Sequence, residues 1–289
     1  GIDYQSNGMF SDFSAPNVKL KLFSRDLSLA ADINLLGKKI KIAQLKGKYL
    51  DSQFLVSGDV DNSDSANLQV DLIGKINLEL SNLSRMLEKQ YPAIKSMRPA
   101  GQLDAQFNLS GNPSDFKSCY LQAKFAGNNF SLYGLNAQSL SLDFLQDQKI
   151  AKIPAMRVAI YDGLIEGSGA LNLNTDNLPY QLELKAEGIK LEKLKMDTPS
   201  KNENISGTLF GELKLNGSSG DLSKLSGAGS FTIKEGRLWE LNLLQGVGKL
   251  LFAKDMGSIE LSECTCAFLI KDKFVSTDNL ELRGNIANL

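Results

Sequence analysis

The sequence predicts a mainly β protein: a long, strongly twisted antiparallel β-sheet that curls into a groove and carries two or three short amphipathic helices. Three observations predict it. Apolar and polar residues alternate along most of the chain, clusters of Gly, Asn, Asp and Ser separate the alternating runs, and part of the pattern recurs within the sequence. Strict alternation is typical of strands with one buried and one wet face, so antiparallel meanders are expected.

The alternation is clearest between Gly101 and Gly111. In this stretch the apolar side chains all fall on one face of an extended chain, and the polar side chains fall on the other. The apolar members are Leu103, Ala105, Phe107 and Leu109. Runs of this kind predict roughly 15 to 18 strands over the whole chain.

An internal repeat supports an array of similar units. Three residues recur 106 positions later in the chain (207 − 101): Gly101, Gly111 and Asp115 return as Gly207, Gly217 and Asp221. We therefore expect a single elongated fragment over residues 1–289, with repeat modules at 49–144 and 161–252 and a further repeat beginning at 253–289.

A few short helices are expected to interrupt the strands. The first carries an apolar stripe, with Ser81 or Asn82 as its N-cap and Pro92 kinking or dividing it. The expected helical segments are 82–97, 191–196 and about 241–252. They are amphipathic, and they could cover an end or a lip of the sheet or simply pack against it as ordinary structural helices.

The size of the apolar face raises the question of what covers it. Some 16 strands at about 4.8 Å spacing form a ribbon roughly 75 Å long, which a few short helices cannot roof. The sheet could close into a barrel, fold into a sandwich, or curl into a groove whose inner face accepts something apolar. Aliphatic walls suit acyl chains, because each methylene removed from water gains about 0.8 kcal/mol. The expected groove-lining residues are Leu68, Val70, Leu72, Leu103, Phe107, Leu109, Leu121, Phe125, Leu209, Leu213, Leu215, Ile233, Cys266, Phe268 and Ile270.

Composition argues against catalysis and nucleic-acid binding. The chain has no histidine, and its 32 Lys and Arg residues balance 33 Asp and Glu residues. Cys119, Cys264 and Cys266 are too few for a disulfide framework and lack the further ligands that zinc requires, so we interpret them as small apolar residues. No enzyme activity, metal, cofactor or nucleic-acid partner is expected.

Two glycine-rich stretches resemble a known family. Residues Ile205 to Gly217, followed by Asp221 to Leu244, are similar to the C-terminal region of AsmA-like proteins, in which a Gly-rich strand pair leads into a turn and a short helix. Here the turn would be Glu235-Gly236-Arg237-Leu238. The resemblance is strongest over 161–289 and weaker over 49–144, where Asn128-Asn129-Phe130 replaces Glu235-Gly236-Arg237. Whether the two copies are built alike is therefore open.

The resemblance implies a fold, a place and a role. It implies a repeating β-groove in the Gram-negative periplasm, anchored in the inner membrane by an N-terminal helix outside this sequence. It also implies a non-catalytic scaffold that conducts the acyl chains of phospholipid, or of another lipid, between the inner and outer membranes. The membrane itself would be contacted through segments outside this sequence, and envelope proteins are possible partners. The alternative is an assembly factor for outer-membrane proteins that binds partner strands at its sheet edges.

Overall fold

The structure is a computed structural model that describes most of the chain. It describes residues 2–6, 15–23, 26–64, 67–88, 93–219, 221–237 and 261–284. Over these residues, 17 strands belong to one antiparallel sheet that follows the chain as a meander. The predicted β class, antiparallel pairing and number of strands are confirmed. The curl of the sheet into a groove stays a prediction.

The chain divides into two compact units. Unit 1 comprises Gly1–Phe130 and Ser141–Pro154, and unit 2 comprises Ser131–Leu140 and Ala155–Leu289. Strands β9 (Leu135–Asp147) and β10 (Ile150–Ile160) contribute residues to both.

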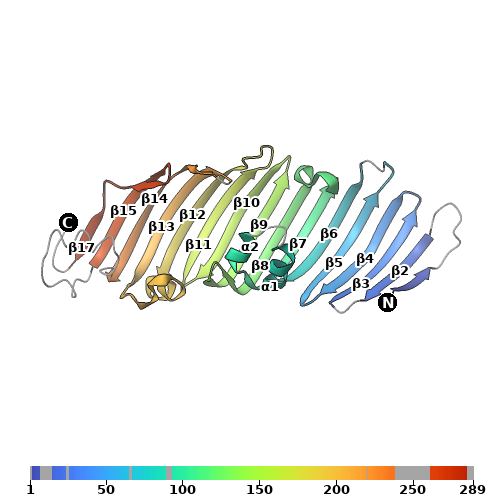
Figure 1. Cartoon of the computed structure of the whole chain (residues 1–289), viewed down its shortest axis with the longest axis horizontal. Coiled ribbons are helices and arrows are strands. Elements are labelled where there is room, and N and C mark those ends of the chain that lie inside the picture. Colours follow the sequence, from blue (N-terminus) through green and yellow to red (C-terminus); the bar gives the residue numbers. More distant parts are fainter. Residues whose placement is uncertain are drawn as a thin grey trace. The chain divides into compact units, whose positions relative to one another are not determined.

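Unit 1 is a run of strands in chain order, interrupted by one pair of helices (Figure 1). Each strand from β1 to β7 pairs antiparallel with the next. Helix α1 contacts β6 and β7. The elements are β1 (Ile2–Ser6), β2 (Ala15–Phe23), β3 (Leu27–Leu36), β4 (Lys39–Tyr49), β5 (Ser52–Asp61), β6 (Gln69–Glu79), α1 (Leu80–Leu87), α2 (Ala93–Met97), β7 (Ala100–Gly111), the 3₁₀ helix η1 (Pro113–Ser118) and β8 (Tyr120–Leu132).

Unit 2 repeats this plan with a shorter helical connection. Strands β11 to β15 pair antiparallel in sequence order, and β15 also pairs with β16 and β17. The elements are β11 (Gly163–Asn172), β12 (Pro179–Lys190), α3 (Leu191–Leu194), the 3₁₀ helices η2 (Lys195–Asp197) and η3 (Pro199–Asn202), β13 (Ser206–Ser218), β14 (Asp221–Arg237), β15 (Leu261–Lys271), β16 (Phe274–Ser276) and β17 (Glu281–Gly284).

The sheet is a single layer over the described residues, because every strand there belongs to it and no second sheet packs on it. Alternation along each strand gives one apolar and one polar face. The side chains of the apolar face are mostly half-buried rather than buried. Within each unit, the described strands therefore form no closed sandwich.

Several hairpin turns consist of residues that are not typical of turns. Both central residues have positive φ in three tight turns: Gln148 and Lys149, Tyr161 and Asp162, and Asp272 and Lys273. Two consecutive residues at positive φ are typical of the type I′ turn, whose twist matches that of the flanking strands. A Gln-Lys or Tyr-Asp pair carries little turn signal, so these sites are set by strand pairing.

The first predicted helix is divided and begins earlier than expected. Helix α1 follows β6 without a break, so its N-cap is Glu79, and the predicted N-cap at Ser81 or Asn82 is wrong. Helix α2 begins at Ala93, directly after Pro92, which lies outside the described residues. The helical piece predicted at 191–196 is present as α3 and η2. The helix predicted at 241–252 falls outside the described residues.

The predicted turn at Glu235 is a β-bulge. Residues Glu235 to Arg237 lie inside β14, and the pairing with β13 shifts there, with Ser206 opposite Arg237 and Thr208 opposite Lys234. Glu235 has a φ of 53°, so the extra residue is absorbed in a left-handed conformation without ending the strand. Leu238 lies outside the described residues.

Candidate functional site

The predicted groove residues of β6 and β7 lie together on the apolar face of unit 1. The register places Leu72 opposite Leu109 and Phe107 opposite Gly74, so alternate residues of both strands share this face. The predicted residues on it are Val70, Leu72, Leu103, Phe107 and Leu109. Leu68 immediately precedes β6.

Strand β8 continues this face. A Cβ atom placed on Gly111 would lie 3.1 Å from the Cα atom of Cys119, and one placed on Gly127 would lie 3.2 Å from the Leu103 side chain. Cys119 and Gly127 therefore border the apolar face of β7. Because Leu121 and Phe125 alternate in step with them, they lie on the same face.

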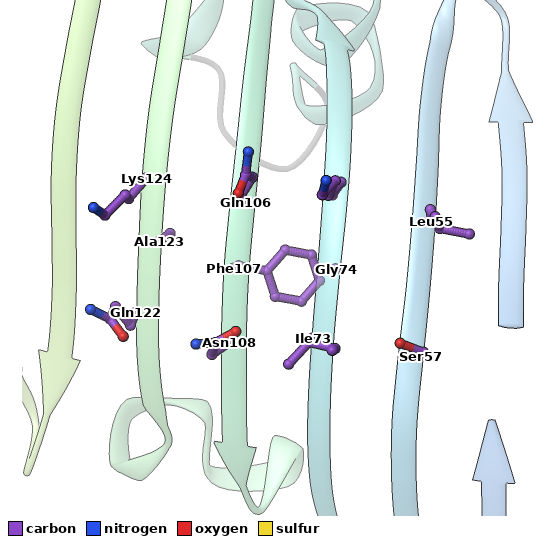
Figure 2. Close-up of a pocket in the computed structure, with 11 residues that line it drawn as sticks. Leu55, Ser57, Ile73, Gly74, Gln106, Phe107, Asn108, Gln122, Ala123 and Lys124 are labelled. Atoms are coloured by element: carbon purple, nitrogen blue, oxygen red, sulfur yellow. The ribbon is translucent and has the colours of Figure 1, made fainter. Parts of the chain in front are cut away.

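Aromatic rings cover glycines on the neighbouring strand. Figure 2 shows the Phe107 ring directed from β7 toward Gly74 of β6. A Cβ atom on Gly74 would lie 2.5 Å from the Phe107 Cζ atom, so the ring occupies the space that a side chain would take. Three further directly opposed pairs have the same arrangement: Phe54 over Gly47, Tyr180 over Gly217, and Phe268 over Gly229. Each ring fills the gap that its glycine leaves in the face.

The predicted groove residues of unit 2 also share one face. One cross-strand row runs from Leu213 through Gly229 to Phe268. The predicted residues on this face are Leu209, Leu213, Leu215, Ile233, Cys266, Phe268 and Ile270. The structure thus brings together the predicted residues of β13, β14 and β15.

A cavity of about 500 Å³ opens on the apolar face of unit 2. Two small residues line it side by side, because Ala186 of β12 is opposite Gly211 of β13, which is in turn opposite Phe231 of β14. The lining residues are Ile165, Leu184, Ala186, Leu191, Leu194, Lys195, Thr198, Ser200, Ile205, Leu209, Gly211, Glu212, Leu213, Ser230, Phe231, Ile233 and Phe268. A volume of this size is within the range of small-molecule sites.

The helical connection after β12 closes one side of this cavity. Leu191 of α3 is buried in a cluster with Ile205, Ile233 and Cys264, and Leu194 packs against the cluster. Because both leucines also line the cavity, the connection adds an apolar wall to the open sheet.

Polar contacts fix this wall to the adjacent hairpins. The Tyr161 hydroxyl donates a hydrogen bond of 2.7 Å to the Asp197 carboxylate, which also accepts one of 3.1 Å from the Asn136 backbone. Lys193 Nζ lies 2.6 Å from the Asp162 carboxylate. Residues from two segments of unit 2, Asn136 and the turn at Tyr161 and Asp162, therefore hold α3 and η2 in place.

Burial and the hydrogen bond to Asp197 raise the pKa of Tyr161 to about 12. Burial also acts to raise the pKa of Asp197, but the hydrogen bonds from Tyr161 and Asn136 outweigh it and lower that pKa. Tyr161 thus stays protonated as donor and Asp197 stays ionised as acceptor. This is a structural contact, since neither group is poised to exchange a proton near neutral pH.

The cysteines behave as small apolar residues. Cys119, Cys264 and Cys266 are buried and free of disulfides. Burial, with a smaller contribution from Cys266, raises the pKa of Cys264 to about 11, so its thiol is a poor nucleophile. Among the described residues, no three His, Cys, Asp or Glu side chains are grouped closely enough to hold a metal ion.

Comparison with protein families gives a match over residues 4–265, to the family described as AsmA. The chain belongs to the AsmA family. Family members are non-catalytic proteins of the cell envelope, and membership suggests a role related to lipid transport. No curated protein and no solved structure matched the chain.

The resemblance inferred from the two glycine-rich stretches is thereby confirmed for most of the chain. Among the described residues, no helix has the length and apolar character needed to span a membrane.

Sequence reasoning missed most of the cavity. Ile165 and Leu184 lie in recognisable alternating strands, but nothing in the sequence shows which strands border the helical connection. Ala186 and Gly211 carry a weak signal, because small residues at inward positions of neighbouring strands leave a gap. Leu191 and Leu194 can be recognised as cavity-lining residues only once it is known that α3 folds back over this face.

Proposed function

We propose that this AsmA-family chain is a lipid-binding scaffold whose apolar face carries the acyl chains of phospholipid. The observation that supports it best is the apolar face itself, which remains half-exposed over the described residues and has no second sheet on it. Each methylene that leaves water for such a surface gains about 0.8 kcal/mol. An acyl chain that binds to this face therefore leaves water and, at the same time, shields the apolar side chains of the sheet from water.

In this proposal the sheet curls into a groove, and the repeat modules at 49–144 and 161–252 provide successive stretches of it. The fifteen predicted lining residues form its floor, and the cavity beside α3 holds part of a chain. The groove spans the periplasm, the full-length protein is anchored in the inner membrane by a segment outside this sequence, and lipid moves toward the outer membrane.

The test is lipid retention by variants that place a charge on one face or the other. Leu213→Glu puts a carboxylate on the apolar face of β13. Phe210→Glu makes a comparable change on the polar face of the same strand, where the Phe210 ring lies 5.7 Å from Lys234 Nζ. Native mass spectrometry and lipid extraction of the purified chain should recover phospholipid from the wild type and from Phe210→Glu.

Leu213→Glu should lose most of this lipid while keeping its β circular-dichroism spectrum. Equal retention by both variants, or wild-type preparations that are stable and free of lipid, would contradict the proposal. If Leu213→Glu unfolds, Leu213→Gln provides a milder polar change at the same site.

A further inference from the structure

The polar face of unit 1 carries lysines on alternate strands in a single cross-strand row. Lys21 of β2 is opposite Ala30, which is opposite Lys46 of β4. Lys46 is opposite Leu55, and Leu55 is opposite Lys75 of β6, which faces Gln106 of β7. Lys124 of β8 lines the same hollow as Lys75 and Gln106.

Figure 2 shows Lys124, Gln106 and Leu55 at one level across β8, β7 and β5. We call the set Lys21, Lys46, Lys75 and Lys124 the lysine row. With strands about 4.8 Å apart, neighbouring members lie roughly 10 Å apart in the sheet.

The lysine row has no matching row of acids. Its members are exposed, and none of them forms an ion pair within the described residues. Opposite charges facing each other across strands are the stabilising arrangement on a wet sheet face. The cross-strand neighbours of this row are alanine, leucine and glutamine, so its positive charges are left available.

Unit 2 shows the usual arrangement on its polar face. Glu183 of β12 is opposite Lys214 of β13, and their side chains form an ion pair of 3.2 Å. Lys185 is opposite Glu166 on one side and Glu212 on the other. Lys185 and Lys214 of unit 2 therefore face acids across the strands, whereas the lysine row in unit 1 does not.

Two hollows lie along the lysine row. The larger, of about 850 Å³, is lined among others by Lys21, Lys46, Lys48 and Lys75 and by one acid, Asp104, which accepts a hydrogen bond of 2.8 Å from Asn77. The smaller, of about 400 Å³, is lined among others by Lys75 and Lys124. Amide side chains line both: Gln53, Asn77, Gln106, Asn108 and Gln122. An amide both donates and accepts hydrogen bonds, as a sugar hydroxyl requires.

Exposed apolar side chains complete the surface. Leu55 is 42% exposed and Ile73 is 55% exposed, and both line the smaller hollow. They offer apolar platforms between the lysines, on which the apolar face of a sugar ring can pack.

We propose that the lysine row and its hollows bind an extended anionic glycan that carries phosphate groups. Lysine is a compact point charge suited to phosphate, and the row contains no arginine fork of the kind that pairs with a planar carboxylate. A flat anionic bilayer would leave the amide-lined hollows unused. This site is on the opposite face from the proposed lipid site and is independent of it.

The experiment measures calorimetric binding of the whole chain to a phosphorylated mannan oligosaccharide. The same glycan after phosphatase treatment, inorganic polyphosphate and phosphatidylglycerol vesicles serve as comparison ligands. We expect binding of the phosphorylated glycan, weakening with added salt, and about tenfold weaker binding by Lys46→Gln/Lys75→Gln.

The matched control is Lys185→Gln/Lys214→Gln, which removes two lysine charges from the polar face of unit 2 and should leave the affinity unchanged. Both double variants should keep the wild-type thermal midpoint within a few degrees, because all four side chains are exposed. Equal loss by both variants would overturn the proposal. So would binding that survives phosphatase treatment, polyphosphate binding as tight as glycan binding, or binding to vesicles alone.

Discussion

Two sections of the chain share a backbone plan and differ in the side chains at one place on their apolar faces. In unit 1, β6 leads through α1 and α2 into β7 and β8, and in unit 2, β12 leads through α3, η2 and η3 into β13 and β14. Gly101 and Gly207 have φ values of 102° and 130°, and Asn129 and Glu235 have 52° and 53°. Because asparagine and glutamate adopt the same unusual conformation, the path of the strand rather than side-chain chemistry sets it.

The difference lies in side-chain volume. At the centre of the unit 1 section, Ile76 is opposite Ala105, which is 5% exposed. At the corresponding place in unit 2, Ala186 is opposite Gly211, and the cavity of about 500 Å³ opens there. The shared backbone thus carries a buried alanine opposite an isoleucine in unit 1, and an alanine and a glycine that line a cavity in unit 2.

The helical connections differ in how firmly they are fixed. In unit 1, Asn82 Nδ2 lies 3.4 Å from Asp51 in the β4–β5 turn. In unit 2, Lys193 makes the corresponding contact with Asp162 at 2.6 Å. Tyr161 adds a hydrogen bond to Asp197 from the turn position that Leu50 occupies in unit 1. Among the described contacts, the connection that forms the cavity wall therefore has the shorter polar contact and the additional hydrogen bond.

The largest expected effect tests the shared backbone. Gly207→Ala should lower the free energy of unfolding by about 3 kcal/mol, because the new Cβ would lie 2.9 Å from the Gly236 Cα atom at a positive φ. Gly101→Ala should behave alike, since its Cβ would lie 2.7 Å from the Asn129 carbonyl oxygen. Urea unfolding measures both.

Gly169→Ala is the control for this pair of variants. Its Cβ would lie 3.2 Å from the nearest atom, the carbonyl oxygen of Gln181, and its φ is not positive, so we expect a change within about 1 kcal/mol. A large effect at Gly207 with none at Gly101 would show that the two glycine positions are not equivalent.

The second effect tests the anchoring of the cavity wall. Tyr161→Phe should destabilise unit 2 by about 1 to 2 kcal/mol at pH 7, because it leaves the Asp197 carboxylate without its tyrosine donor. Chemical denaturation measures the loss. Tyr133→Phe removes a hydroxyl from a side chain that is 57% exposed and should change stability little.

The same contact predicts a pH dependence with a definite sign. The pKa of Tyr161 is raised to about 12 in the folded chain, against an ordinary value of 10. The unfolded chain therefore loses this proton first, and the stabilisation present below pH 10 is lost as the pH rises toward 12. The stability difference between wild type and Tyr161→Phe should shrink over this range. A difference that stays constant to pH 12 would contradict the assigned contact.

The third effect tests the cavity. Ala186→Ile places in unit 2 the residue that Ile76 supplies in unit 1, and it should reduce the acyl-chain lipid bound to the chain. The free energy of unfolding should change by less than about 1.5 kcal/mol, because the added side chain enters open space. Lipid extraction with native mass spectrometry measures the bound lipid, and urea unfolding measures the free energy of unfolding.

Ala228→Ile makes the same change on the polar face of β14, where Ala228 lies opposite Lys214 and Leu269. This variant should bind as much lipid as the wild type. Equal lipid content in both variants would show that the cavity does not hold acyl chains.

The sequence predicts which side chains share a face of the sheet better than it predicts where a cavity forms. Alternation identified the apolar side of Leu103 to Leu109 and of Leu209 to Leu215, because the side-chain period of a strand is a local property. The cavity depends on register, which placed Ala186 opposite Gly211, and on the return of α3 over β13. The lysine row also depends on register. Lys21, Lys46 and Lys75 are far apart in sequence and become neighbours only through strand pairing, so the sequence alone does not predict the row.

The smallest expected effect concerns the exposed charges of unit 1. Hydrogen bonds from Ser63, with a smaller contribution from Lys39 at 3.2 Å, lower the pKa of Asp61 to about 2 from an ordinary 3.8. Its contribution to stability is therefore present above pH 4 and is lost as the pH falls toward 2.

Asp61→Asn should lower the urea midpoint slightly at pH 7 and not at pH 2, and carboxyl NMR titration should give the low pKa directly. Asp59→Asn, two residues away, controls for the change in net charge. Because the Asp61 side chain is 38% exposed, salt should reduce the difference, whereas salt should leave the buried contact of Tyr161 in unit 2 nearly unchanged.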